Sequence, residues 1–393
     1  MKHIGLSFAI CALLCSGNVW AQEKQIEKAS EGNNEFCFDL LNTIWEEGEN
    51  VAFSPFSIST AMAMTYDGAA WRTKWDIAKT MRFQWSRKKN HEAWTSMLNT
   101  FRQMKTPLFK WANAVWAQKD YGFDKEYLNG LQDFDARIDY VDFKNTTERE
   151  KGRKAMNQWV ESKTENKIQH LIRKTNIDHL TRMVLINAIY FNADWKYQFD
   201  PEKTRKNPFK TRTGKVETDF MTMKAELPYA DMDYCSAVEL PYASDQVSML
   251  VMLPAEGYSM SDMLIRLHED GFKSEGFEEK KMMIGLPKFK LKTRYEMKNT
   301  LISMGMVAPF STYANFSGMN GKRNLLIDDV IHQACIEIDE EGTEAAAATA
   351  VVVREKSAAR PMQFIADRPF VFLIRERVEG NILFAGIVEN PEL

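Results

Sequence analysis

The side chains that could carry out catalysis are few and scattered along this chain of 393 residues. None of its six histidines belongs to a His-Glu-x-x-His zinc motif, and the sequence contains neither a Gly-x-Ser-x-Gly nucleophile turn nor a glycine-rich phosphate loop. A Ser–His–Asp group is assembled in three dimensions, so its members need no fixed spacing in a sequence. Because no motif points to catalysis, we expect a protein that is not an enzyme and needs no cofactor or metal. The histidines are His3, His91, His170, His179, His268 and His332.

One segment near the C-terminus indicates a different kind of chemistry. It runs from Asp339 to Val353, opens with Asp-Glu-Glu-Gly-Thr, and then consists almost entirely of alanine and valine until Arg354. Side chains that are small or β-branched fit an exposed loop and also fit a β-strand. A segment that suits both environments is suited to moving between them. We therefore predict that this loop carries the function.

The composition describes a globular protein with a large apolar core. Hydrophobic residues make up 45% of the chain and charged residues 27%, which is typical of globular proteins. The net charge of −3 gives no reason to expect nucleic acid or an anionic lipid surface as a partner. The sequence shows no linker-like stretch and no repeat of solenoid period. We therefore predict one large domain.

The N-terminus has the features of a secretory signal peptide. Lys2 and His3 give a weakly positive start, Ile4 to Leu14 form an apolar run, and a small-residue cleavage site ends at Ala21. The apolar run is too short to span a bilayer, and no other stretch of the sequence is long and apolar enough to do so. We predict a signal peptide at residues 1–21 and a mature domain at residues 22–393.

Removal of this segment implies export of the mature protein to the extracellular space or the periplasm. Anchoring through a lipid on Cys15 is an alternative, although the preceding Leu14 is not the small residue that such a site prefers. Cys37, Cys235 and Cys335 remain after the cleavage. Because they are odd in number and widely spaced, they fit neither a disulfide framework nor a zinc site, and we expect buried free thiols.

Hydrophobic periodicity predicts helices mainly in the first half of the chain and strands in the second. This arrangement is typical of an α+β fold. The predicted helices cover Glu35–Trp45, Ser57–Met64 and Asn157–Thr164. The predicted strands cover Asn50–Pro55, Met183–Phe191, Val247–Leu253, Met282–Leu286, Val330–Ile338, Phe370–Ile374 and Ile382–Val388.

Several of these segments, taken in order, resemble the serpin family of serine protease inhibitors. The resemblance covers nearly the whole mature chain and implies a single large domain with a main mixed β-sheet, two smaller sheets, surrounding helices and an exposed reactive-centre loop at about residues 340–361. The sequence departs from the family pattern at Gly68–Thr73, where Trp71 stands in the place of a usual glycine. The matching segments are Phe53–Ser59, Asn157–Ile168, Leu185–Trp195, Leu286–Lys288, Phe370–Ile374 and Phe384–Pro391.

The resemblance also implies which residues control the opening of the main sheet. One group forms a polar cluster at the point where the sheet parts, and a second group surrounds the point where the loop first enters. The alternative is ordinary core polarity and, for Lys288 and Glu340, a solvated surface pair of small energetic value. The first group comprises Ser54, Ser57, Asn187 and His332, and the second comprises Trp195, Lys288 and Glu340.

The hinge of the loop has a composition that a sheet can accept. An inserted strand turns alternate residues to opposite faces, and with Thr343 facing inward no inward position is charged or proline. The outward set, which starts at Glu344, contains the acidic residue and Arg354. The inward set is Thr343, Ala345, Ala347, Thr349, Val351 and Val353. The predicted hinge comprises Glu340, Gly342, Thr343, Ala345, Ala346, Ala347 and Ala348.

The family's spacing from Glu340 places the cleaved bond at Lys356-Ser357, which would suit a trypsin-like protease because its pocket binds a basic side chain. Counting back from Phe370 leads instead to Ala358. Arg354 is a second basic candidate, and Val353 would suit an elastase-like enzyme. All four registers stay open at this stage.

The sequence therefore predicts a secreted inhibitor that serves as a one-use substrate of serine proteases, with trypsin-like targets first and elastase-like or cysteine proteases as alternatives. We expect a monomer, with loop–sheet polymers as a second assembly. The competing hypothesis is a non-inhibitory binding or chaperone protein of the same fold. The hinge separates the two, since inert members commonly carry charged, bulky or proline residues where this chain has Thr343 and the alanines.

Overall fold

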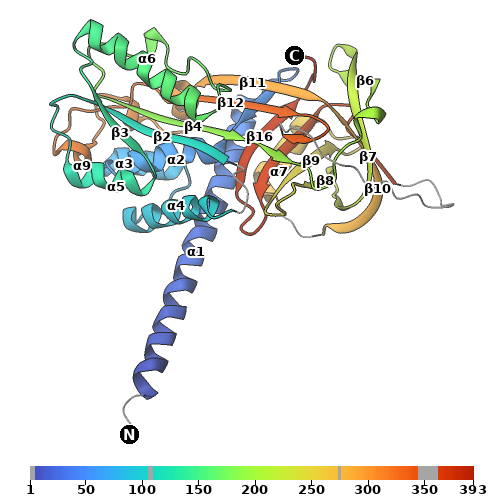
Figure 1. Ribbon diagram of the computed structural model, residues 1–393, viewed down its shortest axis with the longest axis horizontal. Helices are drawn as coiled ribbons and strands as arrows, with labels where there is room; N and C mark the ends of the chain where they lie inside the picture. Colours follow the sequence, from blue (N-terminus) through green and yellow to red (C-terminus); the bar gives the residue numbers. More distant parts are fainter. Residues whose placement is uncertain (1–4, 105–108, 273–275, 344–361) are drawn as a thin grey trace.

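Figure 1 shows the computed structural model, which describes residues 5–104, 109–272, 276–343 and 362–393. Helices dominate the first half of the chain and strands the second, as the periodicity predicted. The helices are α1 (Gly5–Ile44), α2 (Pro55–Tyr66), α3 (Trp71–Thr80), α4 (Arg87–Arg102), α5 (Lys125–Asp133), α6 (Thr146–Lys163), α7 (Met260–Asp270), α8 (Lys298–Ser303) and α9 (Ser317–Asn320).

Helix α1 contains the predicted first helix. Its C-terminal half packs Phe36, Leu40 and Leu41 into the core without exposure, whereas its N-terminal half projects away from the rest of the molecule (Figure 1). The backbone of α1 is continuous from Gly5 to Ile44, so most of the predicted signal peptide lies in the same helix, and its cleavage stays a prediction. Within the described residues, no helix is both long and apolar enough to cross a membrane.

Nine of the described strands form the largest sheet, which is mixed because the pairing of β10 with β14 is parallel and its other described pairings are antiparallel. Eight strands follow the order β1-β16-β15-β9-β8-β7-β10-β14, and β6 pairs with β7 outside this path. These strands are β1 (Val51–Phe53), β6 (Arg205–Thr211), β7 (Gly214–Asp231), β8 (Cys235–Pro241), β9 (Val247–Pro254), β10 (Glu278–Pro287), β14 (Met362–Ile365), β15 (Phe370–Glu376) and β16 (Ile382–Val388). β9, β15 and β16 are buried along their whole length.

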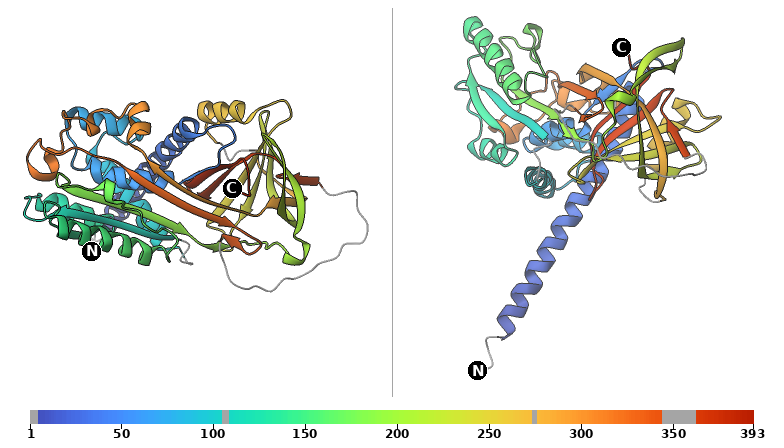
Figure 2. Two further views of the ribbon diagram at one scale, coloured as in Figure 1. Left: turned by 90° about the horizontal axis from the view of Figure 1, so that it is seen from above. Right: turned by 45° about the vertical axis from the view of Figure 1, so that its right-hand side comes forward.

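Two smaller sheets lie side by side next to the large one (Figure 2). One has the order β3-β2-β4 and the other pairs β11 with β12. Helix α6 covers the first of them (Figure 1), and its Met156 and Val160 join a buried cluster with alanines of β2 and β4. The strands are β2 (Phe109–Gln118), β3 (Arg137–Val141), β4 (Met183–Phe191), β11 (Phe289–Glu296) and β12 (Ile331–Ile338).

Strands β4 and β12 are neighbours but share no ladder pairs in the part of the chain that the structure describes. Figure 2 shows the two strand groups next to each other. Near this opening, β13 (Gly342–Thr343) pairs antiparallel with β5 (Ala193–Asp194), and β5 begins two residues after β4 ends. The described strands therefore form three small sheets beside the large one, where two were predicted, because hydrogen bonding is interrupted between β4 and β12. The α+β class and a large mixed sheet are confirmed. The sheet that the resemblance predicts to open corresponds to the groups β3-β2-β4 and β12-β11 together and not to the nine-stranded sheet, because the predicted opening residues Asn187 and His332 lie on β4 and β12.

Candidate hinge and sheet-opening site

Part of the predicted site lies outside the described residues, which end at Thr343 and resume at Met362. The roles predicted for those positions stay predictions. They are the alternatives for the cleaved bond, Lys356, Ser357, Arg354, Val353 and Ala358, and the hinge alanines Ala345, Ala346, Ala347 and Ala348. The remaining predicted residues fall into two groups, one at the hinge and one deeper between the sheets.

The start of the hinge is fixed against β5. Thr343 is 2% exposed, and its hydroxyl shares a 2.8 Å hydrogen bond with the buried Tyr242 hydroxyl. A Cβ on Gly342 would overlap the carbonyl oxygen of Ala193 and the Cα of Asp194. Only glycine permits so close an approach of two backbones. Thr343, the first position predicted to face inward, is thus buried.

A tight turn joins β12 to this hinge. The Asp339 carboxylate accepts hydrogen bonds from the N–H groups of Glu341 (3.0 Å) and Gly342 (3.1 Å). The Asp339 N–H donates in turn to the Gly342 carbonyl oxygen at 3.1 Å. Aspartate favours such turns because its short side chain reaches the backbone two or three residues ahead. The turn sets the point at which the chain leaves β12.

Trp195 packs against this turn and donates two hydrogen bonds to it. Its indole Nε1–H donates to the Asp339 carbonyl oxygen at 3.0 Å, and its backbone N–H donates to Glu341 at 2.8 Å. The indole ring is stacked on Tyr242, with ring centroids 4.5 Å apart and an interplanar angle of 10°. Trp195 is 3% exposed, so a buried indole ring that is both stacked and hydrogen-bonded lies beside the hinge.

Glu340 is held by two partners in the same region. Lys288 Nζ lies 2.7 Å from one carboxylate oxygen and the Thr204 hydroxyl donates to the other at 2.7 Å. Burial by itself would raise the pKa of Glu340, but the hydrogen bonds from Lys288 and Thr204, with the Lys288 charge, hold that pKa below its usual value. The Glu340 side chain is 10% exposed. The pair is therefore partly buried, unlike the solvated surface pair of the alternative reading.

The deeper group begins where β1 leads into α2. Ser54 caps α2 by accepting from the Ser57 N–H at 3.0 Å, and Pro55 occupies the first helical position, where its missing N–H costs nothing. The Ser54 N–H donates to Nε2 of His332 on β12 at 2.9 Å. Nε2 must therefore be the unprotonated nitrogen of the ring. Complete burial lowers the pKa of His332 to about 3, so the ring is neutral at physiological pH.

A chain of amide and hydroxyl groups continues from α2 across the first small sheet. The Ser57 hydroxyl donates to the side-chain oxygen of Asn187 on β4. The Asn187 amide donates to Asn113 on β2 at 2.6 Å, and the Asn113 amide donates to the Phe134 carbonyl oxygen at 2.8 Å. Ser57, Asn187 and Asn113 are buried. α2 is thus bonded to β12 on one side of the opening and to β4 on the other.

The comparisons with known proteins agree with this geometry. A family model described as serpin (serine protease inhibitor) matches residues 31–391. The chain belongs to the serpin family. It is 33% identical to the leukocyte elastase inhibitor of Homo sapiens over 381 residues, a match that covers 93% of this chain and 100% of that protein.

Solved serpin structures superpose over nearly the whole chain. The crystal structure of Serpin48 from the insect Tenebrio molitor has a TM-score of 0.81 at 29% identity and covers 92% of this chain and 98% of that one. The crystal structure of human thyroxine-binding globulin in complex with thyroxine has a TM-score of 0.80 at 28% identity, and the match covers 93% of this chain and 99% of that one. The predicted family and fold are therefore confirmed.

Three residues of this serpin that complete the site were missed at the sequence level. Tyr242 backs Thr343 and Trp195, Thr204 anchors the hinge through Glu340, and Asn113 extends the deeper chain of hydrogen bonds. Their types are common in cores and turns, so the sequence carries no local signal for them. Asp339 opens the segment that was singled out from the sequence, but its part in the turn was not predicted. Asn113 could have been found only from the pairing of β2 with β4, where it stands opposite Asn187.

The departure noted at Gly68–Thr73 has a local structural consequence. Trp71 opens α3 with φ of +52°, in the left-handed region that a glycine would occupy without strain. The turn is kept by Ala70, whose N–H donates to the Asn315 carbonyl oxygen at 2.9 Å, and by Thr73, whose hydroxyl accepts from the Asn315 N–H at 2.8 Å. The departure covers Ala70 and Trp71, of which Trp71 is 77% exposed.

Proposed function

We propose that this serpin inhibits serine proteases as a one-use substrate, by inserting its cleaved loop between β4 and β12. The observation that carries the proposal is the pairing of β13 with β5 beside the gap between β4 and β12, which share no ladder pairs among the described residues. The first inward hinge residue is already buried, and the chain on either side of the gap is linked through α2 by neutral hydrogen bonds.

The pairing of Gly342 with Asp194 and Thr343 with Ala193 also suggests a register for insertion. Each further residue of an antiparallel strand meets the preceding residue of its partner. Continued along β4, this register would bring Thr349 opposite Asn187. The inserted strand would then place an inward hydroxyl beside the amide that joins β4 to Ser57.

The energetics favour insertion. About a dozen inserted residues would form ladders with both β4 and β12, and at a net ~0.5–1.5 kcal/mol per hydrogen bond the gain is on the order of 10 kcal/mol. The exposed-loop state would be trapped kinetically by the intact loop. Loop insertion in serpins is itself a recognised example of such a switch.

In the proposed reaction, the protease serine attacks the carbonyl carbon on the N-terminal side of the cleaved bond and forms an ester with it. The amine of the next residue leaves, taking the serine proton through the protease's general acid. Insertion then carries the attached protease away and distorts its active site, and a displacement of about 1 Å can slow the reaction with water on the order of a hundredfold. The ester survives and the protease is trapped.

For the target, we propose a trypsin-like protease acting at Lys356-Ser357. The similarity to a leukocyte elastase inhibitor supports an elastase-like enzyme acting near Val353 as the alternative. We further propose that the inhibitor is exported after cleavage of residues 1–21 and acts as a monomer outside the cytoplasm.

The test is incubation of the protein with trypsin and, separately, with pancreatic elastase, followed by a denaturing gel and mass spectrometry of the released C-terminal peptide. A covalent complex with either protease is expected, and the peptide mass identifies the bond. Cleavage without a complex at every protease ratio would refute inhibition.

Cleavage without a covalent complex would favour the second candidate function, which is that of a non-inhibitory binding protein. The superposition on thyroxine-binding globulin, which was solved with thyroxine, gives this alternative its support. Such a protein would keep the fold while its cleaved loop traps no protease.

A further inference from the structure

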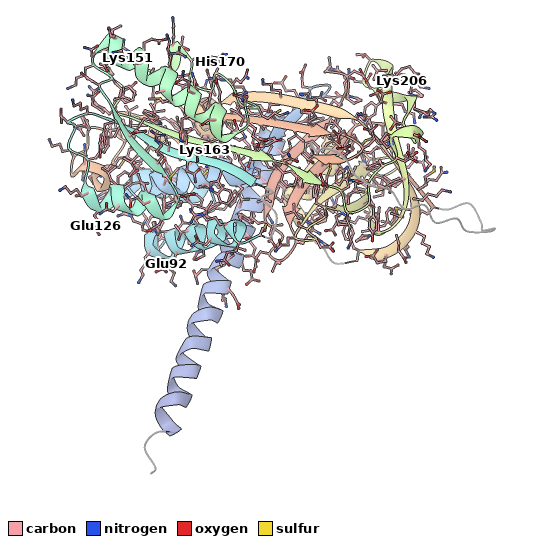
Figure 3. All side chains as sticks on the ribbon, in the orientation of Figure 1. Glu92, Glu126, Lys151, Lys163, His170 and Lys206 are labelled. Atoms are coloured by element: carbon pink, nitrogen blue, oxygen red, sulfur yellow. The ribbon has the colours of Figure 1, made fainter. Side chains whose placement is uncertain are left out.

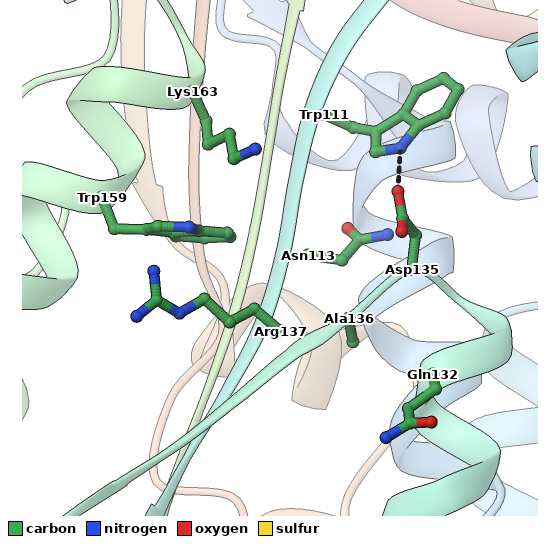
Figure 4. A pocket seen from close by; sticks show the side chains of 8 residues that line it. All are labelled: Trp111, Asn113, Gln132, Asp135, Ala136, Arg137, Trp159 and Lys163. Carbon is green, nitrogen blue, oxygen red and sulfur yellow. Dashed lines mark hydrogen bonds between the residues drawn. The ribbon is translucent and has the colours of Figure 1, made fainter.

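Among the residues whose side chains the structure describes, the exposed tryptophans lie in one short part of the chain. Trp71, Trp75 and Trp85 are 77%, 39% and 59% exposed, although tryptophan is highly buried on average. Trp111 and Trp159 are only partly exposed, and they lie on opposite sides of β2 (Figure 4), so the strand separates their rings. Large rings gathered at one exposed surface mark an interaction site.

Two of the three exposed rings lie on the outer face of α3. This helix buries Ile77 and Thr80, whereas Trp71 and Trp75 are one helical turn apart on the other side. Trp71 has a φ of +52°, a backbone conformation that suits glycine and disfavours a large side chain. The chain therefore keeps an exposed indole ring at a position where it strains the backbone, and strain of this kind is concentrated at functional sites.

Basic side chains lie against these rings. The Arg72 guanidinium carbon is 4.3 Å from the centre of the Trp75 ring, and Lys79 Nζ is 5.0 Å from it. Lys74 Nζ is 4.7 Å from the ring centre of Trp85. Cations and aromatic rings attract each other at such distances, so positive charge and aromatic surface are held together. We call this surface the α3 patch and define it as Trp71, Arg72, Lys74, Trp75, Lys79 and Trp85.

The α3 patch is positively charged although the whole chain has a net charge of −3. Residues 68–91 contain seven lysines and arginines and one acidic residue, Asp76. The Asp76 carboxylate is buried, where it pairs with Arg72 at 2.7 Å and accepts hydrogen bonds from two backbone N–H groups. Burial and the nearby charge of Arg87 lower the pKa of Lys74. The cations of the patch therefore lie close together, and the acidic residue of α3 does not reach its outer face.

We propose that the α3 patch binds the surface of an anionic lipid bilayer. Tryptophan is enriched at the headgroup level of membranes because its ring is apolar and its N–H is polar. Lysine and arginine beside such rings attract anionic headgroups. Within the described residues no helix could cross a membrane, so this contact is peripheral. The net charge of the chain gave no sign of it, because the charge is concentrated on one helix.

The position of α3 gives this contact a consequence for the orientation of the protein. In Figure 1, α3 lies at the opposite end of the molecule from β10. Strand β14, which follows the proposed reactive loop in the sequence, pairs with β10. A protein bound through the α3 patch would hold β10 and β14 away from the bilayer. The inference goes beyond the proposed function, and its test needs no protease.

The binding test is sedimentation of the full chain with vesicles of phosphatidylcholine and phosphatidylglycerol in equal parts and, separately, with vesicles of phosphatidylcholine alone. The chain should bind the anionic vesicles at least about tenfold more strongly, since each cation near an anionic surface strengthens binding about fivefold. Salt at about 1 M should remove most of this preference. The apolar run at residues 4–14 is uncharged and is the same in every variant, so differences between variants report on the patch.

Lys79→Glu tests the charge of the patch. It should weaken binding to the anionic vesicles at least about tenfold. Lys163→Glu is the matched control, because Lys163 and Lys79 are each the basic residue in the last turn of their helices. Lys163 lies on α6 (Figure 3), on the other side of the sheet β3-β2-β4 from α3 (Figure 2). This variant should bind within about twofold of the wild type.

Trp71→Gly tests the aromatic part of the patch without damage to the fold. Loss of the exposed ring should weaken binding to the anionic vesicles at least about fivefold. The same change relieves the left-handed backbone conformation, so the thermal unfolding temperature should be no lower than that of the wild type. A purely structural role of Trp71 predicts the reverse, which is lower stability and unchanged binding.

Equal binding of the wild type to anionic and neutral vesicles would overturn the proposal, as would wild-type binding by a folded Lys79→Glu, checked by circular dichroism. If Trp71→Gly binds vesicles as the wild type does while dextran sulfate binds saturably, the patch is a site for a soluble polyanion and the lipid proposal is wrong. Failure to trap a protease would refute the proposed function and leave vesicle binding untouched, so the two failures are distinguishable.

Discussion

At the scale of single residues, the contacts of a buried and of a partly buried histidine give opposite dependences of stability on pH. His332 accepts from the Ser54 backbone in full burial, whereas His91 lies between Asp67 at 2.6 Å and Asp133 at 3.1 Å. Burial lowers the pKa of His332 to about 3. The hydrogen bond that the His91 ring donates to the Asp67 carboxylate raises the pKa of His91, aided by the charges of both carboxylates and opposed by burial.

The direction in which His332 changes stability with pH depends on whether the folded or the unfolded state binds the proton more readily. Between pH 6.5 and 3, His332 binds a proton in the unfolded state but stays unprotonated in the folded state. The free energy of unfolding therefore decreases as pH falls, by up to about 1.4 kcal/mol per pH unit. In urea titrations from pH 6.5 to 4.5, His332→Gln should lose less stability than the wild type by about 2–3 kcal/mol.

His91→Gln is the companion variant with the opposite sign. The contribution of His91 is complete below its unfolded pKa and is lost as pH rises through its raised folded pKa. The wild type should therefore lose more stability than His91→Gln between pH 6 and pH 8. If the free energy of unfolding of both variants changes with pH as that of the wild type does, the folded structure does not shift the pKa of either histidine in the direction given.

Gly342 gives a second prediction at this scale. A methyl group there would overlap the backbone of Ala193 and Asp194, so Gly342→Ala should separate β13 from β5 and cost about 1–3 kcal/mol of stability. Guanidinium unfolding measures the loss. Gly130→Ala, in α5, is the control because the added methyl group meets only an ordinary contact with His91 at 3.8 Å, and this variant should be at least as stable as the wild type.

At the scale of elements, the sequence was most informative where periodicity and burial agree. Met183–Phe191 was predicted as a strand covered on both faces and is β4 with the same bounds. The helix predicted at Ser57–Met64 is α2, but its start was placed two residues late, although a cap residue followed by proline marks a helix start locally.

The site could be predicted only in part, because its remaining contacts depend on the tertiary fold. In the described residues, β4 and β12 are about 140 residues apart in sequence and are not joined by ladder hydrogen bonds. A local sequence pattern cannot predict whether two such distant strands pair. The stacking of Trp195 on Tyr242 and the pairing of Asn113 with Asn187 have the same origin. The positions after Thr343 carry roles that rest on the family resemblance and on strand alternation.

The turn between β12 and β13 is an element whose position depends on one indole N–H. Trp195→Phe keeps an aromatic ring against Tyr242 but removes the donor to the Asp339 carbonyl oxygen. Leaving that acceptor without its partner should cost about 1–3 kcal/mol, with faster hydrogen exchange in the peptide that contains residues 339–342. Trp85→Phe, at an exposed position, is the control and should change neither quantity. Unchanged exchange in Trp195→Phe would show that the turn does not depend on the indole N–H of Trp195.

At the scale of the whole molecule, the proposed mechanism makes cleavage a stabilising event. A cleaved chain with its loop inserted gains the ladders of a full sheet, on the order of 10 kcal/mol. The cleaved protein should therefore unfold at a far higher guanidinium concentration than the intact one. This gain and the trapping of protease have one cause, so a variant that blocks insertion should lose both together.

Thr343→Arg is that variant. Thr343 is 2% exposed with its hydroxyl on Tyr242, and a guanidinium group at this position would be buried without a carboxylate partner, which is strongly unfavourable. The protease should still cleave the loop, but the covalent complex should fall at least about tenfold, since a penalty above 1.4 kcal/mol exceeds a tenfold change. Denaturing gels measure the complex, and guanidinium unfolding of the cleaved variant should show little gain.

Glu344→Arg provides the matched control, because strand alternation turns the next residue to the outer face. This variant adds the same side chain one position later and should trap protease within about twofold of the wild type, with the full gain in stability after cleavage. If Thr343→Arg traps as well as Glu344→Arg does, the hinge does not insert with Thr343 inward. The burial of Thr343 beside β5 would then be a static contact of the uncleaved protein, and the register proposed along β4 would be wrong.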